Sequence, residues 1–498
     1  MTKHEMINGF RGLVTTGLVG LLVACGGGGG GSDDSSVSSE SIVARGVITQ
    51  LGSIWVLGVE YETPDGNSYS NDDSTSTVAD FKVGQVVRIR GRRNDDGVSG
   101  TAEVVEYEAE VEGAADGNGD INGIVILQTP STNAPGIPNP LSNGIRYEVS
   151  GIWLDDSTIE ATFIKQDDDG DGVDEIKGFV EAVVPGVSLT VRGILFSYGG
   201  PTVVEIGDFV EVHFNGTVAS RVELEDDFND QKNGQEVEFE GAVNMDLADL
   251  ANCPAGADFL IDTTCIDWDS VPASGWMDGL VDESDMVSGI RVEAEGHFNA
   301  GGLLIAEKIK GRGNRVRITS TASNVSEPNF DLFFGDIQVT TMSGITEYDL
   351  DNMGTSVASI SNGDGLEVRG IRTGPTSMLA LRIKSENVNA NRHELRAVVD
   401  NGGADSSNNT ITVMGITSVA GADTELEIED VEIAPGSGLT TEADINAFLD
   451  LIDDDGMVNI SNGPNDVVDV RIDTTNGGDG SIGSPYEADQ IEIEEEDD

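Results

Sequence analysis

The amino-acid sequence predicts an all-β protein: a tandem array of small antiparallel β-barrels, OB-like and either closed or half-open, behind an export signal and a Gly/Ser-rich tether. Residues 83–113 read as two strands joined by an acidic glycine turn. Weaker copies of this pair recur at intervals of roughly sixty to ninety residues, which indicates tandem small domains. The 64 glycines and the low aromatic content of 5% are typical of short strands separated by many turns.

The second strand of residues 83–113 alternates strictly between apolar and acidic side chains. One face of this strand carries the apolar residues Val105, Tyr107, Ala109 and Val111. The other face carries the acidic residues Glu106, Glu108, Glu110 and Glu112. A period of two is that of a β-strand with one buried face and one face in water. We therefore expect these four glutamates to be exposed to solvent.

The two halves of this unit return along the chain. The opening half recurs at 177–197 and 395–418, and the closing half begins at Gly144, Gly207, Gly289, Gly365 and, less clearly, Gly456. Each unit offers about five or six short strands, enough for a small barrel that leaves few open sheet edges. We expect a signal peptide (1–24), a tether (25–43) and six β repeats: 44–113, 114–174 (divergent), 175–230, 231–312 (with a Cys-containing insertion), 313–390 and 391–498 (with an acidic tail).

The N-terminus predicts export and lipid anchoring. Lys3 and Arg11 precede an apolar run of twelve residues, 13–24, too short to span a bilayer but typical of a signal peptide. It ends in Leu-Val-Ala followed by Cys25, which resembles the bacterial lipoprotein box and implies acylation of Cys25 (diacylglycerol and palmitate). The alternative is an ordinary secretory signal with an incidental cysteine. Gly26 after the cysteine favours the outer membrane of a Gram-negative bacterium, and the following Gly/Ser-rich segment is a flexible tether.

The charge balance excludes one class of partner. The chain has 90 Asp and Glu against 27 Lys and Arg, a formal charge of −63. Such a surface repels phosphate backbones, so we expect no nucleic-acid partner. It is typical of a solvated acidic protein from a marine or halophilic source.

The motifs of the first unit resemble a known family. ARGVI at its start, VGQVVRIRG and GTAEVVEYEAEVEG are similar to exported bacterial proteins that carry tandem β-barrel domains of unknown function, often behind a lipoprotein signal. The likeness is good for residues 44–113, fair for 175–224 and partial for the later units. It implies the fold and the location, and it carries no catalytic residues.

The inserted segment of the fourth unit holds Cys253 and Cys265. Exported chains meet oxidising conditions, and no third cysteine competes once Cys25 is acylated, so we expect a disulfide between them. The alternative is two free thiols. A zinc site is disfavoured because no histidine lies nearby in the sequence.

The sharpest local motif is the acidic run at residues 167–175. Asp167, Asp169 and Asp171 have the 1, 3, 5 spacing of a calcium loop, Gly172 permits the turn at position 6, and Glu175 falls at position 9. The bidentate glutamate of an EF-hand at position 12 is missing. We expect either a weak calcium site or, alternatively, a charged turn without metal.

No catalytic motif is recognisable in the sequence. We find no nucleophile elbow, zinc-protease motif or phosphate loop, and His213 and His297 are expected to be surface or turn-proximal side chains. The sequence therefore favours a non-catalytic cell-envelope lipoprotein that binds an envelope polymer or a protein partner, with calcium as the one conceivable cofactor. The alternative is a cryptic carboxylate-dependent, glycoside-type hydrolase.

Overall fold

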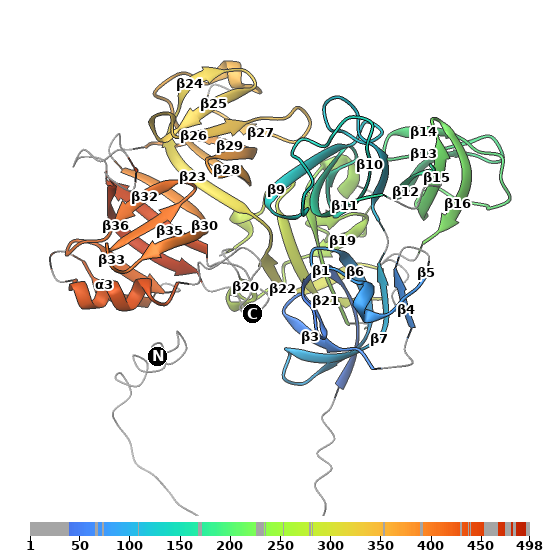
Figure 1. Cartoon of the computed structure of the whole chain (residues 1–498), viewed down its shortest axis with the longest axis horizontal. Helices are drawn as coiled ribbons and strands as arrows, with labels where there is room; N and C mark the ends of the chain where they lie inside the picture. The colour runs from blue at the N-terminus through green and yellow to red at the C-terminus, as the bar shows by residue number, and fades with distance from the viewer. Residues whose placement is uncertain are drawn as a thin grey trace, which may run out of the picture.

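The computed structural model is almost entirely β, and its described residues form six small barrels in tandem (Figure 1). The described residues are 39–64, 68–71, 74–107, 109–167, 172–225, 234, 236–251, 253–277, 280, 282–351, 354–388, 392–428, 431–436, 438, 440–452, 467–473, 480–481 and 485–494. The expected signal peptide and Cys25 lie outside them.

The first barrel shows the plan that the others repeat. Its strands are β1 (Ser39–Gln50), β2 (Ile54–Val56), β3 (Val59–Glu62), β4 (Ser68–Asn71), β5 (Ser74–Thr75), β6 (Val86–Asn94) and β7 (Ser99–Tyr107), with the 3-10 turn η1 (Val78–Asp80). They close in the order β1–β2–β3–β7–β6–β1, in which only β3 and β7 are parallel among these neighbours. This is the circuit of an OB-like barrel, and its five positions are called strands 1 to 5 below.

The next three barrels repeat this circuit. Barrel 2 comprises β8 (Val111–Ala114), β9 (Val125–Asn133), β10 (Arg146–Asp155) and β11 (Thr158–Gln166), with isolated bridges at Ala115, Ile121 and Ile124 in place of strand 2. Barrel 3 comprises β12 (Asp174–Val184), β13 (Ser188–Val191), β14 (Ile194–Ser197), β15 (Phe209–Asn215) and β16 (Val218–Leu224). Barrel 4 comprises β17 (Glu236–Asn244), α2 (Leu247–Leu250), β18 (Phe259–Ile261), β19 (Thr264–Asp267), η3 (Ala273–Gly275), β20 (Trp276–Met277), η4 (Glu283–Asp285), β21 (Arg291–Phe298) and β22 (Leu304–Gly311).

Two further barrels form the left-hand part of Figure 1. Barrel 5 comprises β23 (Arg315–Thr321), β24 (Ser323–Ser326), β25 (Asn329–Leu332), η5 (Phe333–Gly335), β26 (Ile337–Thr340), β27 (Glu347–Asp349), η6 (Val357–Ser359), β28 (Gly365–Gly374) and β29 (Ser377–Ser385). Barrel 6 comprises β30 (Arg392–Asp405), β31 (Thr410–Val413), β32 (Ile416–Val419), β33 (Glu425–Ile428), β34 (Val431–Pro435), α3 (Glu442–Leu449), β35 (Val467–Asp473) and β36 (Tyr486–Glu494). None of the described helices is long and apolar enough to cross a membrane.

The barrels are joined in pairs through strand 1. β1 pairs in parallel with β17, β8 pairs antiparallel with β12, and β23 pairs antiparallel with β30. In β1, β12, β17 and β30 the contact uses the first half of the strand, before strand 2 begins to cover that edge. A half-strand left open would expose unpaired backbone groups. Pairing the open halves with one another gives three continuous sheets of 13, 9 and 14 strands, and the three junctions are called seams 1–4, 2–3 and 5–6 below.

Alternating apolar residues fill each barrel. In barrel 1 the inward side chains include Ile42 and Ala44 of β1, Ile89 of β6, and Val105 and Tyr107 of β7, each at most 1% exposed. The expected orientation of Val105 and Tyr107 is therefore observed. The strand itself ends at Tyr107, however, and Val111–Ala114 forms β8 of the second barrel.

In four of the barrels a β-bulge in strand 5 lies opposite a glycine of strand 4. The pairing with strand 5 shifts register at Gly91, Gly151, Gly296 and Gly370. A Cβ on Gly151 would lie 2.3 Å from the carbonyl oxygen of Glu160, and the other three positions are as tight against the partner backbone. Only glycine lets the two strands approach so closely while the sheet curls into a barrel.

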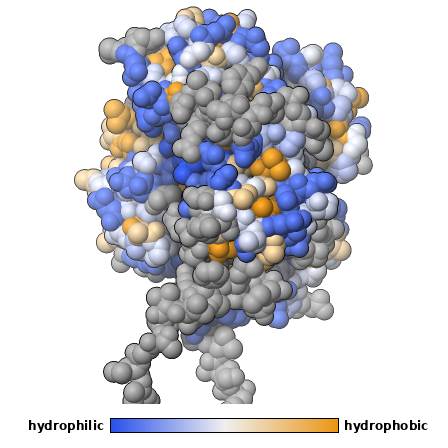
Figure 2. All heavy atoms as spheres, turned by 90° about the vertical axis from the view of Figure 1, so that its left-hand side faces the viewer, coloured by the Kyte–Doolittle hydropathy of each residue, from blue (hydrophilic) through white to orange (hydrophobic). Residues whose placement is uncertain are grey.

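The outer surface is mainly hydrophilic. On the face shown in Figure 2, hydrophobic side chains form small separated patches among hydrophilic ones. This matches the strongly acidic composition.

Replacing Gly151 should test the role of the bulge. Gly151→Ala is expected to lower the free energy of unfolding by about 1–3 kcal/mol, because the backbone of β11 must move to admit the methyl group. Gly117→Ala in the same barrel is the matched control: no heavy atom lies within 4 Å of its Cβ position, so a change within about 0.5 kcal/mol is expected. Equal melting curves of both variants and the wild type would contradict this explanation.

Candidate functional site

The most unusual feature of the structure is that many acidic side chains on the outer faces of the strands are buried between barrels. Among the residues that the structure describes, nine glutamates are at most 5% exposed: Glu110, Glu112, Glu148, Glu160, Glu211, Glu238, Glu240, Glu293 and Glu295. The expectation that Glu110 and Glu112 face water is therefore wrong. The alternation of apolar and acidic residues is real, but a second barrel covers the acidic face at these positions.

Arginines neutralise the buried carboxylates across seam 1–4. Arg93 of barrel 1 reaches three glutamates of barrel 4, with Nη2 2.7 Å from Glu295 Oε1 and 3.5 Å from Glu236, and Nη1 3.4 Å from Glu238. Burial and the neighbouring Glu293 raise the pKa of Glu238 well above its usual range. Glu293 in turn pairs with Lys310 at 3.1 Å and stays charged, its pKa held low.

Barrel 2 is bound to its neighbours by two further arginines. Arg45 of β1 lies 2.9 Å from Glu110 and 3.0 Å from Asp262 of barrel 4. Arg291 of β21 lies 3.1 Å from Glu160 of β11 and also contacts Glu240. Both arginines thus join different barrels, and Arg291 is 6% exposed. A buried arginine with two carboxylates satisfies charges that neither barrel could satisfy alone.

A row of charged residues crosses seam 2–3. Neighbouring strands place side by side the residues Lys165, Glu148, Glu112, Glu175, His213 and Arg221. Glu148 also accepts a hydrogen bond from the hydroxyl of Tyr107 in barrel 1 at 2.6 Å. Three glutamates are consecutive in this row. Burial, a hydrogen bond with Asp167 and the charge of Glu175 raise the pKa of Glu112 to about 9, so the central carboxyl is neutral at neutral pH.

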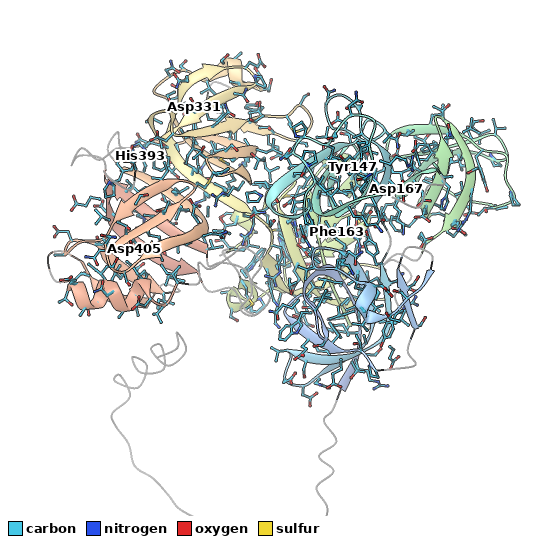
Figure 3. The ribbon with its side chains drawn as sticks, in the orientation of Figure 1. Tyr147, Phe163, Asp167, Asp331, His393 and Asp405 are labelled. Atoms are coloured by element: carbon cyan, nitrogen blue, oxygen red, sulfur yellow. A yellow bond between two sulfur atoms is a disulfide. The ribbon has the colours of Figure 1, made fainter. Side chains whose placement is uncertain are left out.

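Arg146 contacts both the end of barrel 2 and the start of barrel 3. Its guanidinium donates to Asp167 at 2.5 Å, Asp174 at 2.6 Å and Glu112 at 3.1 Å. Asp167 ends the described part of barrel 2 and Asp174 begins β12, so one arginine holds both ends of the acidic loop. Figure 3 shows Asp167 near the junction of these barrels.

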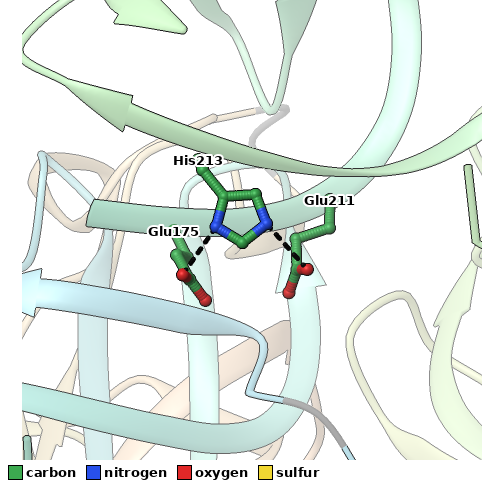
Figure 4. Close-up of side chains that lie close together, drawn as sticks. All are labelled: Glu175, Glu211 and His213. Atoms are coloured by element: carbon green, nitrogen blue, oxygen red, sulfur yellow. Dashed lines mark hydrogen bonds and ion pairs between the residues drawn. The ribbon is translucent and has the colours of Figure 1, made fainter. Parts of the chain in front are cut away.

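His213 bridges two glutamates of barrel 3 (Figure 4). Its Nδ1 lies 2.6 Å from Glu175 Oε1, and its Nε2 lies 3.2 Å from Glu211 Oε2 and 3.5 Å from Glu223. Burial alone would lower the pKa of His213, but the hydrogen bonds and charges of Glu175 and Glu211 outweigh it and raise the pKa to about 9. His213 is 7% exposed, so the expectation of a surface histidine is wrong. His297, in contrast, is half-exposed as expected.

Glu175, Glu211 and His213 could also hold a metal ion, since one ligand atom from each lies within 4.8 Å of the others. Asp258, Asp267 and Asp269 of barrel 4 form a second such group among the described residues. The imidazole–carboxylate set suits a transition metal such as zinc, whereas the three aspartates suit calcium. At the histidine, a metal would have to displace a proton that two carboxylates stabilise.

The structure places two of the predicted metal ligands at seam 2–3 and the two predicted disulfide cysteines in barrel 4. Asp167 and Glu175 both lie at seam 2–3, where Arg146 and His213 engage one oxygen of each, while Asp169 and Asp171 lie outside the described residues. Cys253 and Cys265 are joined by a disulfide beside β19. The sequence alone does not identify Arg146 and His213 as partners of Asp167 and Glu175. Their positions opposite these acidic residues depend on how β8 and β12 pair.

A groove lies where barrels 2, 3, 4 and 5 meet. Its volume is about 640 Å³, and its wall includes Asp156, Glu181 and Asp246 together with the disulfide. Arg192 lines it as well, stacked over the ring of Trp153 at 4.1 Å. The glutamates whose pKa burial raises, Glu112, Glu160, Glu238 and Glu427, do not line it.

The comparisons with known proteins agree with a domain of unknown function. Residues 45–106, which make up most of barrel 1, match the family described as domain of unknown function DUF5666. No curated protein matches the chain. A solved structure, "drosophila Unr CSD456", aligns at 11% identity over 43% of this chain and 97% of that chain with a TM-score of 0.10, which does not establish a shared arrangement of domains.

Removing the guanidinium of Arg291 should destabilise the assembly strongly. Arg291→Met leaves Glu160 and Glu240 buried without their cation, and we expect the free energy of unfolding to fall by about 3–5 kcal/mol. The matched control is Arg92→Met, whose exposed pair with Glu103 is worth less than about 1 kcal/mol. Chemical denaturation measures the free energy of unfolding of both variants. Equal decreases in the two variants would show that the buried ion pairs contribute no more to stability than the exposed pair.

Seam 2–3 should weaken in alkali. The folded pKa values of His213 and Glu112 are both raised to about 9, so their contribution is present at low pH and is lost as the pH rises toward 9. For His213 the loss begins near pH 6.5, and for Glu112 it begins lower. We expect the melting temperature to fall by several degrees between pH 6.5 and 9.

Two substitutions should flatten this pH dependence. Glu112→Gln mimics the protonated carboxyl, so the variant should melt above the wild type at pH 9. His213→Gln removes the imidazolium, whereas the exposed control His297→Gln should leave the wild-type profile unchanged. Melting curves of the Glu112 and His213 variants that follow the wild-type profile at every pH would contradict the assignment.

Proposed function

We propose that the chain is a non-catalytic, lipid-anchored protein of the cell envelope, in which six barrels form a rigid scaffold that presents binding surfaces to an envelope polymer or a protein partner. The observation that carries this proposal is the set of three strand-1 seams, each of which carries ion pairs between its two barrels. Such junctions fix the orientation of each barrel surface relative to the next. Flexibly linked binding domains would need neither continuous sheets nor buried charges at their contacts.

A binding role has more support than the alternative of a carboxylate-dependent hydrolase. A glycosidase needs an acid with a raised pKa facing a second carboxylate across a substrate cleft. Here Glu112 and Glu238 are buried at seams, Glu160 is buried at the contact between barrels 2 and 4, and Glu427 lies in β33 of barrel 6. None of these glutamates with raised pKa lines the groove of about 640 Å³, whose carboxylates are others. The acidic surface also makes nucleic acid an unfavourable partner.

Lipid anchoring is tested at Cys25. In a bacterium that processes lipoproteins, the wild-type chain should incorporate labelled palmitate and fractionate with the outer membrane, whereas Cys25→Ala should do neither. Cys253→Ala is the matched cysteine control and should still be labelled. Labelling of the Cys25 variant, or a wild-type chain that stays unlabelled, would contradict the anchor.

We further propose that the loop at residues 167–175 binds calcium weakly and stiffens seam 2–3. What supports this is the spacing of Asp167, Asp169 and Asp171 in the sequence, together with the contacts of the two ends, Asp167 and Asp174, to Arg146. Calorimetric titration of the chain with calcium should give about one equivalent of binding. Asp169→Asn with Asp171→Asn should abolish it, whereas Asp95→Asn with Asp96→Asn in another acidic turn should not.

A titration without saturable heat, together with a melting temperature that chelator does not change, would reduce the loop to a charged turn.

A further inference from the structure

Barrel 3 differs from the other five at the contact between strands 3 and 5. In barrel 2 this contact is made by β9, which pairs over five residues with β11. Barrels 1, 4, 5 and 6 have four to seven parallel pairs on the same edge of strand 5. In barrel 3 the described strands β14 and β16 share one pair, Ser197 with Val218.

In barrels 1, 4, 5 and 6, a short additional strand pairs with the part of the strand 5 edge that strand 3 leaves open. β4, β20, β27 and β33 each follow strand 3 and lie parallel to strand 5. Each brings an apolar or aromatic side chain to its barrel: Tyr69, Trp276, Tyr348 and Leu426 belong to, or pack against, the cores. In barrel 3, residues 198–208 occupy the corresponding place in the sequence; they bring Tyr198 and Val204 to the core but form no strand.

Beyond the single pair of Ser197 with Val218, no strand in the described part of the chain pairs with the outer edge of β16. On its inner edge β16 pairs with β15, and the amide of Glu225 donates to the carbonyl of Phe209 at 2.9 Å. In an antiparallel pair the backbone groups alternate between the two edges. Glu225 thus faces β15, and the amide and carbonyl of the preceding Leu224 face away from it.

Much of the surface of barrel 3 near the start of this edge is apolar, although β16 itself carries Arg221 and Glu223. Seven of the ten exposed large apolar side chains among the described residues belong to barrel 3, at 55–80% exposed: Val184, Val187, Leu195, Val203, Ile206, Val218 and Leu224. Cross-strand pairing aligns Val184 with Ser188, Ser197 and Val218 on one outer face. Residues 182–204 contain one charged side chain, Arg192, in a chain with 90 acidic residues. Exposed apolar surface concentrated in this way marks an interaction site.

We propose that the outer edge of β16 is the docking site for an extended, uncharged segment of a partner protein, which adds as a parallel strand where the other barrels use β4, β20, β27 or β33. The proposal rests on the proposed function of the chain as a binding scaffold and names its class of partner. Main-chain hydrogen bonds supply affinity, and the apolar side chains around Leu224 and Val218 select uncharged residues. Barrel 3 lies at the right-hand end of the molecule in Figure 1, where a partner can reach it.

The charge of the chain favours a foreign segment over a second copy. Two chains of −63 repel each other, whereas a short uncharged strand brings no charge to the edge. A lipid surface fits less well, because hydrocarbon offers no hydrogen bonds to the backbone of an open strand.

The test measures binding of the full-length chain in mild detergent to a fluorescent synthetic strand, the peptide TVTVYVT, by fluorescence anisotropy. Saturable binding is expected, and the same peptide N-methylated at alternate residues should bind at least tenfold more weakly because it cannot pair with a strand edge. Leu224→Pro removes the outward amide without removing a bond to β15 and should also weaken binding at least tenfold. Leu224→Thr keeps the amide and should remain within about twofold of the wild type.

Equal binding of both peptides, or no binding by the wild-type chain, would overturn the proposal. A dimer of the wild type that Leu224→Pro converts to monomer would overturn it in favour of pairing between copies. Mass spectrometry of the peptide after incubation separates this question from the proposed function: cleaved peptide would refute the non-catalytic role while leaving the docking edge in place. Because the N-methyl comparison uses the unmodified chain, it decides the matter even if Leu224→Pro unfolds.

Discussion

Within one of these barrels, the other strands cannot pair with both edges of strand 1 along its whole length. The rest of this structure depends on what pairs with the part of strand 1 that is left open. Strand 2 covers the second half of strand 1, so the first half keeps an open edge. The chain pairs these open halves with one another at β1–β17, β8–β12 and β23–β30. Six barrels that would each expose a sticky edge become three continuous sheets.

Pairing the strands in this way forces charged faces together, and the buried ion pairs follow from it. Outward residues of strands 1 and 4, such as Glu112, Glu238 and Glu293, lose their solvent when a second barrel covers them. Arg93, Arg146 and Arg291 then provide the compensating charge, and surplus carboxyls such as Glu112 keep a proton. Such pairs contribute less to net stability than apolar packing does, but a wrong alignment of barrels would leave buried charges unpaired. The pairs therefore select one arrangement of the barrels.

The barrels were predictable from the sequence, and their assembly was not. Period-two alternation around Val105 and the glycines that precede strand 4 report on contacts within one unit, which are local in sequence. The burial of Glu110 and the bridge at His213 depend on contacts between units that no local pattern encodes. An acidic strand face reads identically whether water or an arginine from another barrel covers it. The same limit explains why the open edge of β16 is visible only by comparison of the six barrels in three dimensions.

Hydrogen exchange at the seams tests the central claim most directly. If the first halves of β23 and β30 are paired on both edges, the amides of residues 317–319 and 394–396 should all exchange as slowly as those of the barrel interior. β16 is the internal reference, because its outward-facing amides should exchange quickly until a strand binds. Slow exchange throughout the seam residues, with alternating fast and slow amides in β16, is the predicted result. Alternating fast and slow amides at residues 317–319 and 394–396 would mean that the barrels do not share their first strands, and the account would be wrong.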